Sequence, residues 1–327
     1  MRLTLTLLIL LIGQSITGQS ISKKIQKIVD EIAAANVYES SAIHFSDTKT
    51  TQWNRFEKLK NKATDQELIA LTDHEHPVVR GYSFQALASR SHPETFAVLQ
   101  KHLKDYESLS ISYGYNTQNQ TVGLFCISLL YSNRIPTFKL TDQQKFMVDS
   151  VLLFDSKIKR SENPYLLTHI TPNNAFYSRI KEIYKEERSS SALIAISKYK
   201  KPADTALIAD WLTRKSTDDQ LSGLNAVRNF PHPAFLPYLQ KIQEQEIKKT
   251  SGFNFSLISK LYLATVQFKN RESRALIENT LSEAEKPALD YHAASIRSAL
   301  TLYPDPVYAG IKETIETSNM NKGVLKK

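Results

Sequence analysis

The chain has 327 residues, of which 41% are hydrophobic, and carries a formal net charge of +9 and one cysteine. A single cysteine excludes an internal disulfide, so the fold must be held by packing, for which this length is ample. Beyond the N-terminus no run reaches the roughly 18 apolar residues of a membrane span, and none is expected.

The first 19 residues have the pattern of a secretory signal peptide. Arg2 is followed by the apolar run Leu3–Ile12 and by the small and polar residues Gly13–Ser20. No cysteine lies nearby, so a lipoprotein anchor is not expected. We therefore expect export to the periplasm or the extracellular space, which also argues against a nucleic-acid partner.

The N-terminal part of the mature chain is predicted to be helical. Ile21–Ala35 and Gln52–Lys60 are expected to form helices that cap an array, and Thr64-Asp-Gln-Glu67 is a capping box that opens another helix. His76–Arg90 and His92–Leu103 then predict two helices, each opened by a proline near its first position.

Residues 64–103 resemble a HEAT repeat. The matching features are Pro77 at the helix start, the following Val78-Val79-Arg80, and Ala86-Leu87 further along. Gly81 departs from the pattern and predicts close backbone packing, because glycine inside a helix is otherwise unfavourable by about 1 kcal/mol. The resemblance extends more loosely over 188–318 and implies an all-α, right-handed α-solenoid of antiparallel helix hairpins, a HEAT-like superhelix.

Two stretches interrupt the helical rhythm. Residues 107–120 are uncharged after Glu107, and 155–171 are polar. Inserts in solenoids often lie on the binding face, so Tyr113, Tyr115 and Asn116 are candidate contact residues. Between the inserts, Thr141-Asp-Gln-Gln144 is a second capping box, and a helix is expected from Thr171-Pro172 to about Glu187.

The C-terminal part repeats an aromatic residue at 31-, 38- and 35-residue intervals, at Tyr199, Phe230, Phe268 and Tyr303. Such a period is typical of helical-hairpin solenoids. Each aromatic ends one helix, and the next helix begins three residues later, which predicts that the rings are buried between neighbouring helix pairs. The expected first helices of the pairs are 190–199, 217–230, 253–268 and 287–303, and the expected second helices are 202–214, 233–248, 271–282 and 306–317. Asp305 is a good N-cap for the last of them, whereas Lys201 and His232 are poorer caps.

The predicted organisation is a single solenoid domain after the signal peptide. Its parts are an N-terminal cap with the first repeat (20–106), the insert (107–120), irregular helical repeats (121–187), regular repeats (188–318) and a flexible tail (319–327).

No catalytic constellation is apparent in the sequence. Asp73-His74-Glu75-His76 is the densest group of metal-ligand types, but it supplies too few ligands for zinc, and no cofactor motif occurs. Cys126 lies in an apolar run and is expected to be buried and inert.

We therefore expect a non-enzymatic, exported binding or scaffolding module that captures a protein or peptide on a curved helical surface. The alternative is an envelope-associated enzyme or an anionic glycan-binding protein with its site on the inserts. Lysine clusters also suggest weak contact with anionic envelope polymers.

Overall fold

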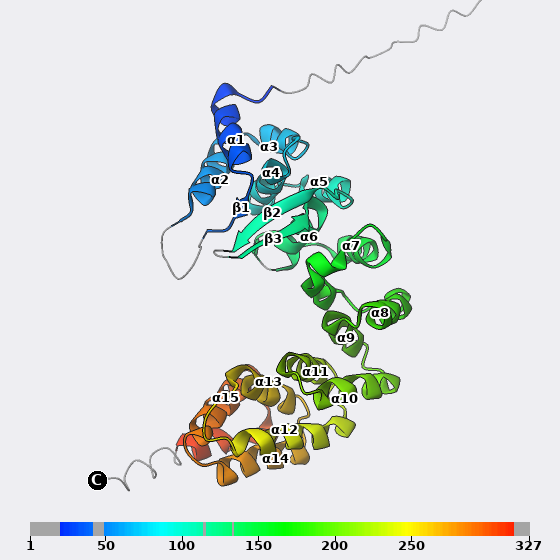
Figure 1. Ribbon diagram of the computed structural model, residues 1–327, viewed down its shortest axis with the longest axis vertical. Coiled ribbons are helices and arrows are strands. Elements are labelled where there is room, and N and C mark those ends of the chain that lie inside the picture. Colours follow the sequence, from blue (N-terminus) through cyan, green and yellow to red (C-terminus); the bar gives the residue numbers. More distant parts are fainter. Residues whose placement is uncertain (1–19, 42–48, 114–115, 133, 317–327) are drawn as a thin grey trace, which may run out of the picture. The chain divides into compact units, whose positions relative to one another are not determined.

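The computed structural model describes residues 20–41, 49–113, 116–132 and 134–316. The expected signal peptide and the expected flexible tail lie outside these residues. The described chain is predominantly helical, as predicted, and divides into two compact units, 1–140 and 141–327. Figure 1 labels the helices and strands of both units.

The first unit is built around one helix. The helices of this unit are α1 (Lys23–Ala35), α2 (Thr51–Lys62), α3 (Asp65–Leu71), α4 (Pro77–Ser89), α5 (Thr95–His102) and α6 (Val122–Tyr131). Helix α4 contacts each of the other five. A Cβ on Gly81 would lie 3.0 Å from the ring of Phe125, which confirms the predicted close packing at this glycine. Cys126, on α6, is buried, and burial raises the pKa of its thiol, as expected for an inert cysteine.

The first unit also contains a small sheet that the sequence interpretation did not include. The strands β1 (Tyr38–Glu39), β2 (Ser108–Tyr113) and β3 (Asn116–Thr121) lie in that order, with β1 parallel and β3 antiparallel to β2. Leu109 and Ile111 alternate with serines along β2 and are fully buried. The stretch 107–120 is therefore a β-hairpin rather than an irregular loop, because its apolar residues have the period of a half-buried strand.

The capping box at the start of α3 is present as predicted. The Thr64 hydroxyl accepts a hydrogen bond from the Glu67 amide at 3.1 Å, and the Glu67 carboxylate accepts one from the Thr64 amide at 2.8 Å. The same carboxylate accepts a hydrogen bond from the Ser22 amide, next to the start of α1. The box therefore stabilises two helix starts.

We expect Thr64→Ala to lower the free energy of unfolding by about 1 kcal/mol, because the cap of α3 loses its acceptor. Urea unfolding followed by circular dichroism would measure the change. Thr301→Ala, at an exposed position inside α15, should change stability by less than about 0.5 kcal/mol. Equal losses in the two variants would contradict the capping role.

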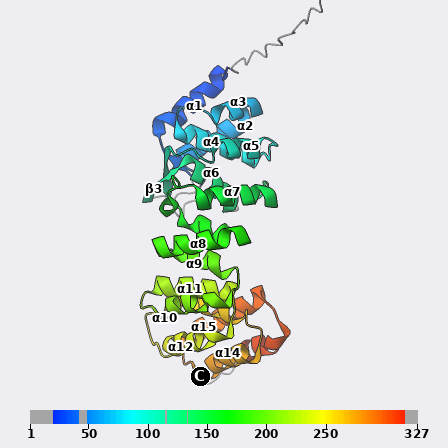
Figure 2. The ribbon, with the colours of Figure 1, turned by 90° about the vertical axis from the view of Figure 1, so that its right-hand side faces the viewer.

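The described part of the second unit consists of helices joined by short connections. They are α7 (Asp142–Phe154), α8 (Asn174–Glu187), α9 (Ser190–Ser197), α10 (Thr205–Thr213), α11 (Thr217–Asn229), α12 (Leu236–Ile247), α13 (Phe255–Thr265), α14 (Arg271–Glu283) and α15 (Ala288–Leu302). Two 3-10 helices, η1 (Arg160–Glu162) and η2 (Pro164–His169), lie between α7 and α8. Within this unit α9, α11, α13 and α15 pack one against the next, and so do α10, α12 and α14. Figure 2 shows the succession from α8 to α9 and α11.

Three prolines, at positions 202, 233 and 306, each open a short 3-10 turn, whereas α14 begins without a proline after Asn270. These turns are η3 (Pro202–Asp204), η4 (Pro233–Phe235) and η5 (Pro306–Tyr308), and residues 311–316 are again helical. The Asp305 carboxylate caps its turn by accepting a hydrogen bond from the Val307 amide at 3.1 Å, as predicted. Lys201 makes no side-chain cap, whereas Nδ1 of His232 accepts a hydrogen bond from the Ala234 amide at 3.3 Å at the start of η4.

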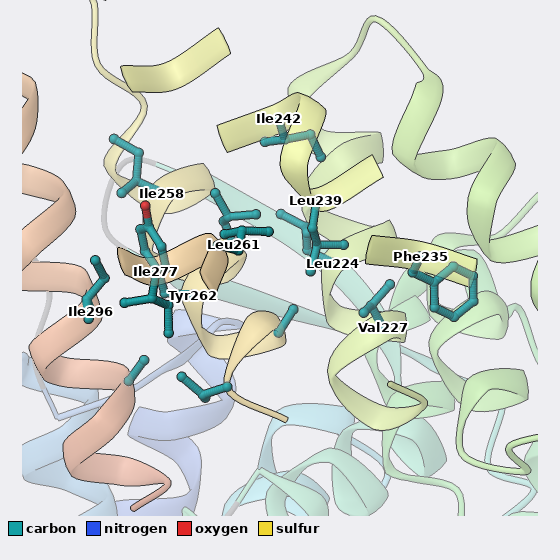
Figure 3. Close-up of a cluster of buried hydrophobic side chains, with 14 of the residues drawn as sticks. Leu224, Val227, Phe235, Leu239, Ile242, Ile258, Leu261, Tyr262, Ile277 and Ile296 are labelled. Atoms are coloured by element: carbon teal, nitrogen blue, oxygen red, sulfur yellow. The ribbon is translucent and has the colours of Figure 1, made fainter. Parts of the chain in front are cut away.

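A smaller apolar cluster of the second unit joins α7, η2, α8 and α9, and a larger apolar core runs from α9 to residue 315. Side chains from α11, α12, α13, α14 and α15 meet in it, among them Leu224, Leu239, Leu261, Ile277 and Ile296 (Figure 3). Of the four recurring aromatics, Phe230 is buried, and Tyr199, Phe268 and Tyr303 are partly buried against apolar clusters.

Candidate functional site

The residues that the sequence singled out for binding lie around the β2–β3 turn. Tyr113 ends β2, and its backbone is opposite Asn116, the first residue of β3. Asn116 is exposed, whereas Tyr115 lies outside the described residues. The hairpin therefore places Tyr113 and Asn116 next to each other, and their contact role stays a prediction.

The Asp73–His76 segment is tied to the start of β2 by Arg80. The Arg80 Nε lies 2.9 Å from Asp105 Oδ2, and its Nη2 lies 2.6 Å from Glu107 Oε2. Its Nη1 donates a hydrogen bond to the carbonyl of His74 at 2.8 Å. The guanidinium therefore joins two loops and neutralises carboxylates, which is a structural role.

His102 lies between the carboxylates of Asp73 and Asp105. Its Nε2 is 3.2 Å from Asp73 Oδ1, without the alignment of a hydrogen bond, and its Nδ1 is 3.4 Å from Asp105 Oδ2. Burial lowers the pKa of His74, whose Nδ1 accepts a hydrogen bond from the His76 amide. In the described part of the chain, no three or more histidine, cysteine, aspartate or glutamate side chains are arranged so that they could hold a metal ion.

A cavity of the second unit lies near the loops that join α10 to α11 and α12 to α13. Its volume is about 450 Å³. We call it the basic hollow, because four cationic side chains line it: Arg214, Lys215, Lys241 and Lys249. Lys215 and Lys249 are 34 residues apart, which is about one repeat, so the two loops place equivalent lysines on either side of it.

The cations of the basic hollow are only partly neutralised. Arg214 pairs with Asp210 at 2.6 Å, and Lys249 pairs with Glu246 at 2.6 Å. Lys215 and Lys241 are exposed, and within the described ranges neither has a carboxylate within 4.0 Å. The hollow therefore keeps uncompensated positive charge that an anionic ligand can neutralise.

Three aromatic rings lie beside the basic hollow and form what we call the aromatic patch. The ring of Tyr291 is 4.9 Å from that of Phe253 and 4.7 Å from that of Phe255, between centroids. Phe255 is 57% exposed and Tyr291 is 38% exposed. Gly252 and Asn254, on either side of Phe253, both line the hollow, so the two features share one loop.

The aromatic patch is held in place by the start of α13. The Asn254 side chain accepts a hydrogen bond from the Leu257 amide at 2.9 Å and so caps the helix. The cap makes Phe255 the first residue of α13, where its ring stands clear of the core. Because the rings contact one another and the helix start is fixed by its cap, their side chains have little freedom to lose when a partner binds. They therefore offer exposed apolar area to a partner at a small entropic cost.

A second hollow of about 690 Å³ is lined by residues of α10 and α11 and of the segments before α8 and α9. Its lining is of mixed charge and includes Arg160, Arg188, Asp218 and the indole of Trp211. The guanidinium of Arg214 lies over the Trp211 ring at 4.1 Å. Arg214, which lines the basic hollow, therefore also contacts a residue that lines the second hollow.

Sequence comparison adds no family to this description. No family model matches the chain, and neither a curated protein nor a solved structure shows a significant match. None of the helices in the described ranges is both long and apolar enough to cross a membrane.

Proposed function

We propose that the protein is an exported binding module that captures an acidic, partly apolar peptide segment of a protein partner. In this proposal the second unit is a right-handed, HEAT-like α-solenoid of antiparallel hairpins, and the segment lies along the edge formed by the basic hollow and the aromatic patch. We propose no reaction and no cofactor.

The packing of the helices supports the solenoid part of the proposal. First helices contact first helices and second helices contact second helices, in chain order, and one apolar core continues through the series. Repeated units of this kind place equivalent loops in a row, which makes an extended edge or face available for binding. The period of the aromatic residues agrees with this arrangement.

The observation that carries the binding proposal is that the loop between α12 and α13 borders both the basic hollow, with its uncompensated cations, and the aromatic patch. Lysine and arginine side chains attract an acidic segment and accelerate its association. Exposed aromatic rings are the residue type that most often dominates binding energy at protein interfaces. A partner needs both properties to use the whole surface, so a segment that combines carboxylates with apolar side chains fits better than a purely anionic chain.

We expect a fluorescein-labelled peptide of alternating glutamate and leucine to bind the full chain with a dissociation constant on the order of 10 μM. Fluorescence anisotropy at physiological salt would measure it. The double variant Lys215→Gln/Lys241→Gln and the single variant Phe255→Ala should each weaken binding by about tenfold, since each removes one of the two complementary features.

The matched control is Lys200→Gln/Lys269→Gln, which removes the same charge at exposed positions of the second unit. Neither residue lines a hollow, so this variant should leave binding unchanged. Equal affinity of the wild type and the Lys215/Lys241 variant would contradict the proposal.

The rival function is binding of an anionic polymer by charge alone, which the four cations also favour. A polyglutamate probe separates the two. If polyglutamate bound as tightly as the patterned peptide and both were lost at high salt, the rival would replace our proposal, because screening removes purely electrostatic binding.

A further inference from the structure

A third hollow, of about 530 Å³, lies on the opposite side of α12 from the basic hollow. It is formed between α12 and α14, and we call it the acidic hollow. Leu236 and Leu276 supply apolar lining, and Glu244, Glu272 and Asn279 supply polar groups. None of its lining residues is a lysine or an arginine, so α12 separates two cavities of opposite charge.

The acidic hollow contains a buried hydrogen-bond acceptor that lacks a partner. Gln243 lines the cavity and is 0% exposed. Its Nε2 donates hydrogen bonds to the carbonyl of Leu276 at 2.8 Å and to the hydroxyl of Thr280 at 2.5 Å. These bonds fix the orientation of the amide, and they leave Oε1 without a hydrogen bond to any described residue. An unpaired buried amide oxygen is unfavourable, and a ligand that donates an N–H would relieve the cost.

The two carboxylates of the acidic hollow lack cations. Glu244 accepts a hydrogen bond from the Gln240 amide at 2.9 Å, which is a neutral donor. Within the described part of the chain no lysine, arginine or histidine nitrogen lies within 4.0 Å of either Glu244 or Glu272. By contrast, Glu278, on the same helix as Glu272, is paired with Arg274 at 2.7 Å.

We propose that the acidic hollow binds an arginine side chain of a partner. The planar guanidinium carries five N–H donors, so one group can reach the Gln243 oxygen and a carboxylate together. The aliphatic stem of the side chain would pack on the leucines, as long charged side chains do on apolar surface. A calcium ion fits less well, because it requires six to eight oxygen ligands and the hollow offers two carboxylates.

The test uses the full chain and N-acetyl-arginine amide as the probe, followed by changes in backbone amide NMR shifts. We expect saturable shifts confined to α12 and α14, with a dissociation constant on the order of 1 mM, as for a single partly exposed ion pair. The variant Glu244→Gln/Glu272→Gln should weaken binding at least fivefold. Glu278→Gln, outside the hollow and already paired, should leave binding unchanged.

Three results would overturn the proposal. They are the absence of saturable shifts, an equal response of the Glu278 and Glu244/Glu272 variants, and N-acetyl-lysine amide or calcium chloride binding as tightly as the arginine probe. The inference does not depend on the proposed peptide-binding surface formed by the basic hollow and the aromatic patch. The patterned glutamate–leucine peptide should bind the Glu244→Gln/Glu272→Gln variant as it binds the wild type, so failure at one site is distinguishable from failure at the other.

Discussion

Phe230→Ala is expected to lower the free energy of unfolding of the second unit by about 3 kcal/mol. Phe230 is 7% exposed and lies where α11 ends, with its ring 6.0 Å from that of the fully buried Phe235. Truncation to alanine removes apolar contacts and leaves a cavity at the turn between α11 and α12 that the neighbouring side chains cannot fully refill. Urea unfolding of the full chain, followed by tryptophan fluorescence and circular dichroism, would measure the loss.

Phe255→Ala is the matched control, because it removes the same ring from a position that is 57% exposed. It should change stability by less than about 0.5 kcal/mol, although it is expected to weaken peptide binding. A loss below about 1 kcal/mol in Phe230→Ala would contradict the role of the recurring aromatics as core residues. It would then make them candidates for the binding surface instead.

The helices of the second unit were largely predictable because their determinants are local. The predicted first helix 217–230 is observed as Thr217–Asn229, and the predicted second helix 271–282 is observed as Arg271–Glu283. The serine at 216 and the asparagine at 270 accept hydrogen bonds from the first turns of these helices. Prolines were located correctly as the start of second helices, but the turn that they open is 3-10 rather than α.

The β-hairpin was missed because residues 107–120 were interpreted only as an insert between helices, and their period was not compared with that of a strand. The alternation of Leu109 and Ile111 with serines is the pattern that could have identified it, together with the glycine at 114 between two polar runs. The pairing with β1 could not be predicted in this way. Tyr38–Glu39 is only two residues long, and its parallel partner lies about 70 residues further along the chain.

The candidate site was only partly visible in the sequence. The lysines at 248 and 249 stand out as a cluster, but the basic hollow combines Lys249 with Arg214, Lys215 and Lys241 from other segments. Their convergence depends on how α10, α12 and the two following loops pack, which no local pattern specifies. The spacing of about one repeat between Lys215 and Lys249 is the one feature that could have indicated it.

A buried polar network in the second unit was also outside the reach of sequence patterns. The Tyr262 hydroxyl lies 2.7 Å from Nδ1 of His292 and 2.9 Å from the hydroxyl of Thr280, which in turn accepts a hydrogen bond from Gln243. These four side chains come from α12, α13, α14 and α15, and all are fully buried. They therefore connect every helix from α12 to α15 through hydrogen bonds inside the apolar core.

The network makes the stability of the second unit depend on pH through His292. Burial lowers the pKa of His292 to about 4, and the smaller effect of the Glu246 backbone carbonyl acts in the opposite direction. Above about pH 6.5 the imidazole is neutral in both the folded and the unfolded chain, so this residue causes no pH dependence there. Between pH 6.5 and 4 the unfolded chain binds a proton that the folded chain does not, so stability falls with falling pH.

We expect this residue to reduce the free energy of unfolding by about 3 kcal/mol between pH 6.5 and pH 4, at about 1.4 kcal/mol for each pH unit. His292→Asn removes the titrating group and keeps an acceptor for the Tyr262 hydroxyl. Urea unfolding of both proteins should be measured at a series of pH values. The carboxylates and the other histidines contribute equally to the pH dependence of both proteins, so the difference between the two curves reports His292 alone. The variant should be less stable at pH 7, and its stability should fall less steeply than that of the wild type below pH 6.5. Parallel curves would mean that His292 takes up its proton as readily in the folded chain as in the unfolded one, which a residue enclosed by four helices cannot do without opening the core.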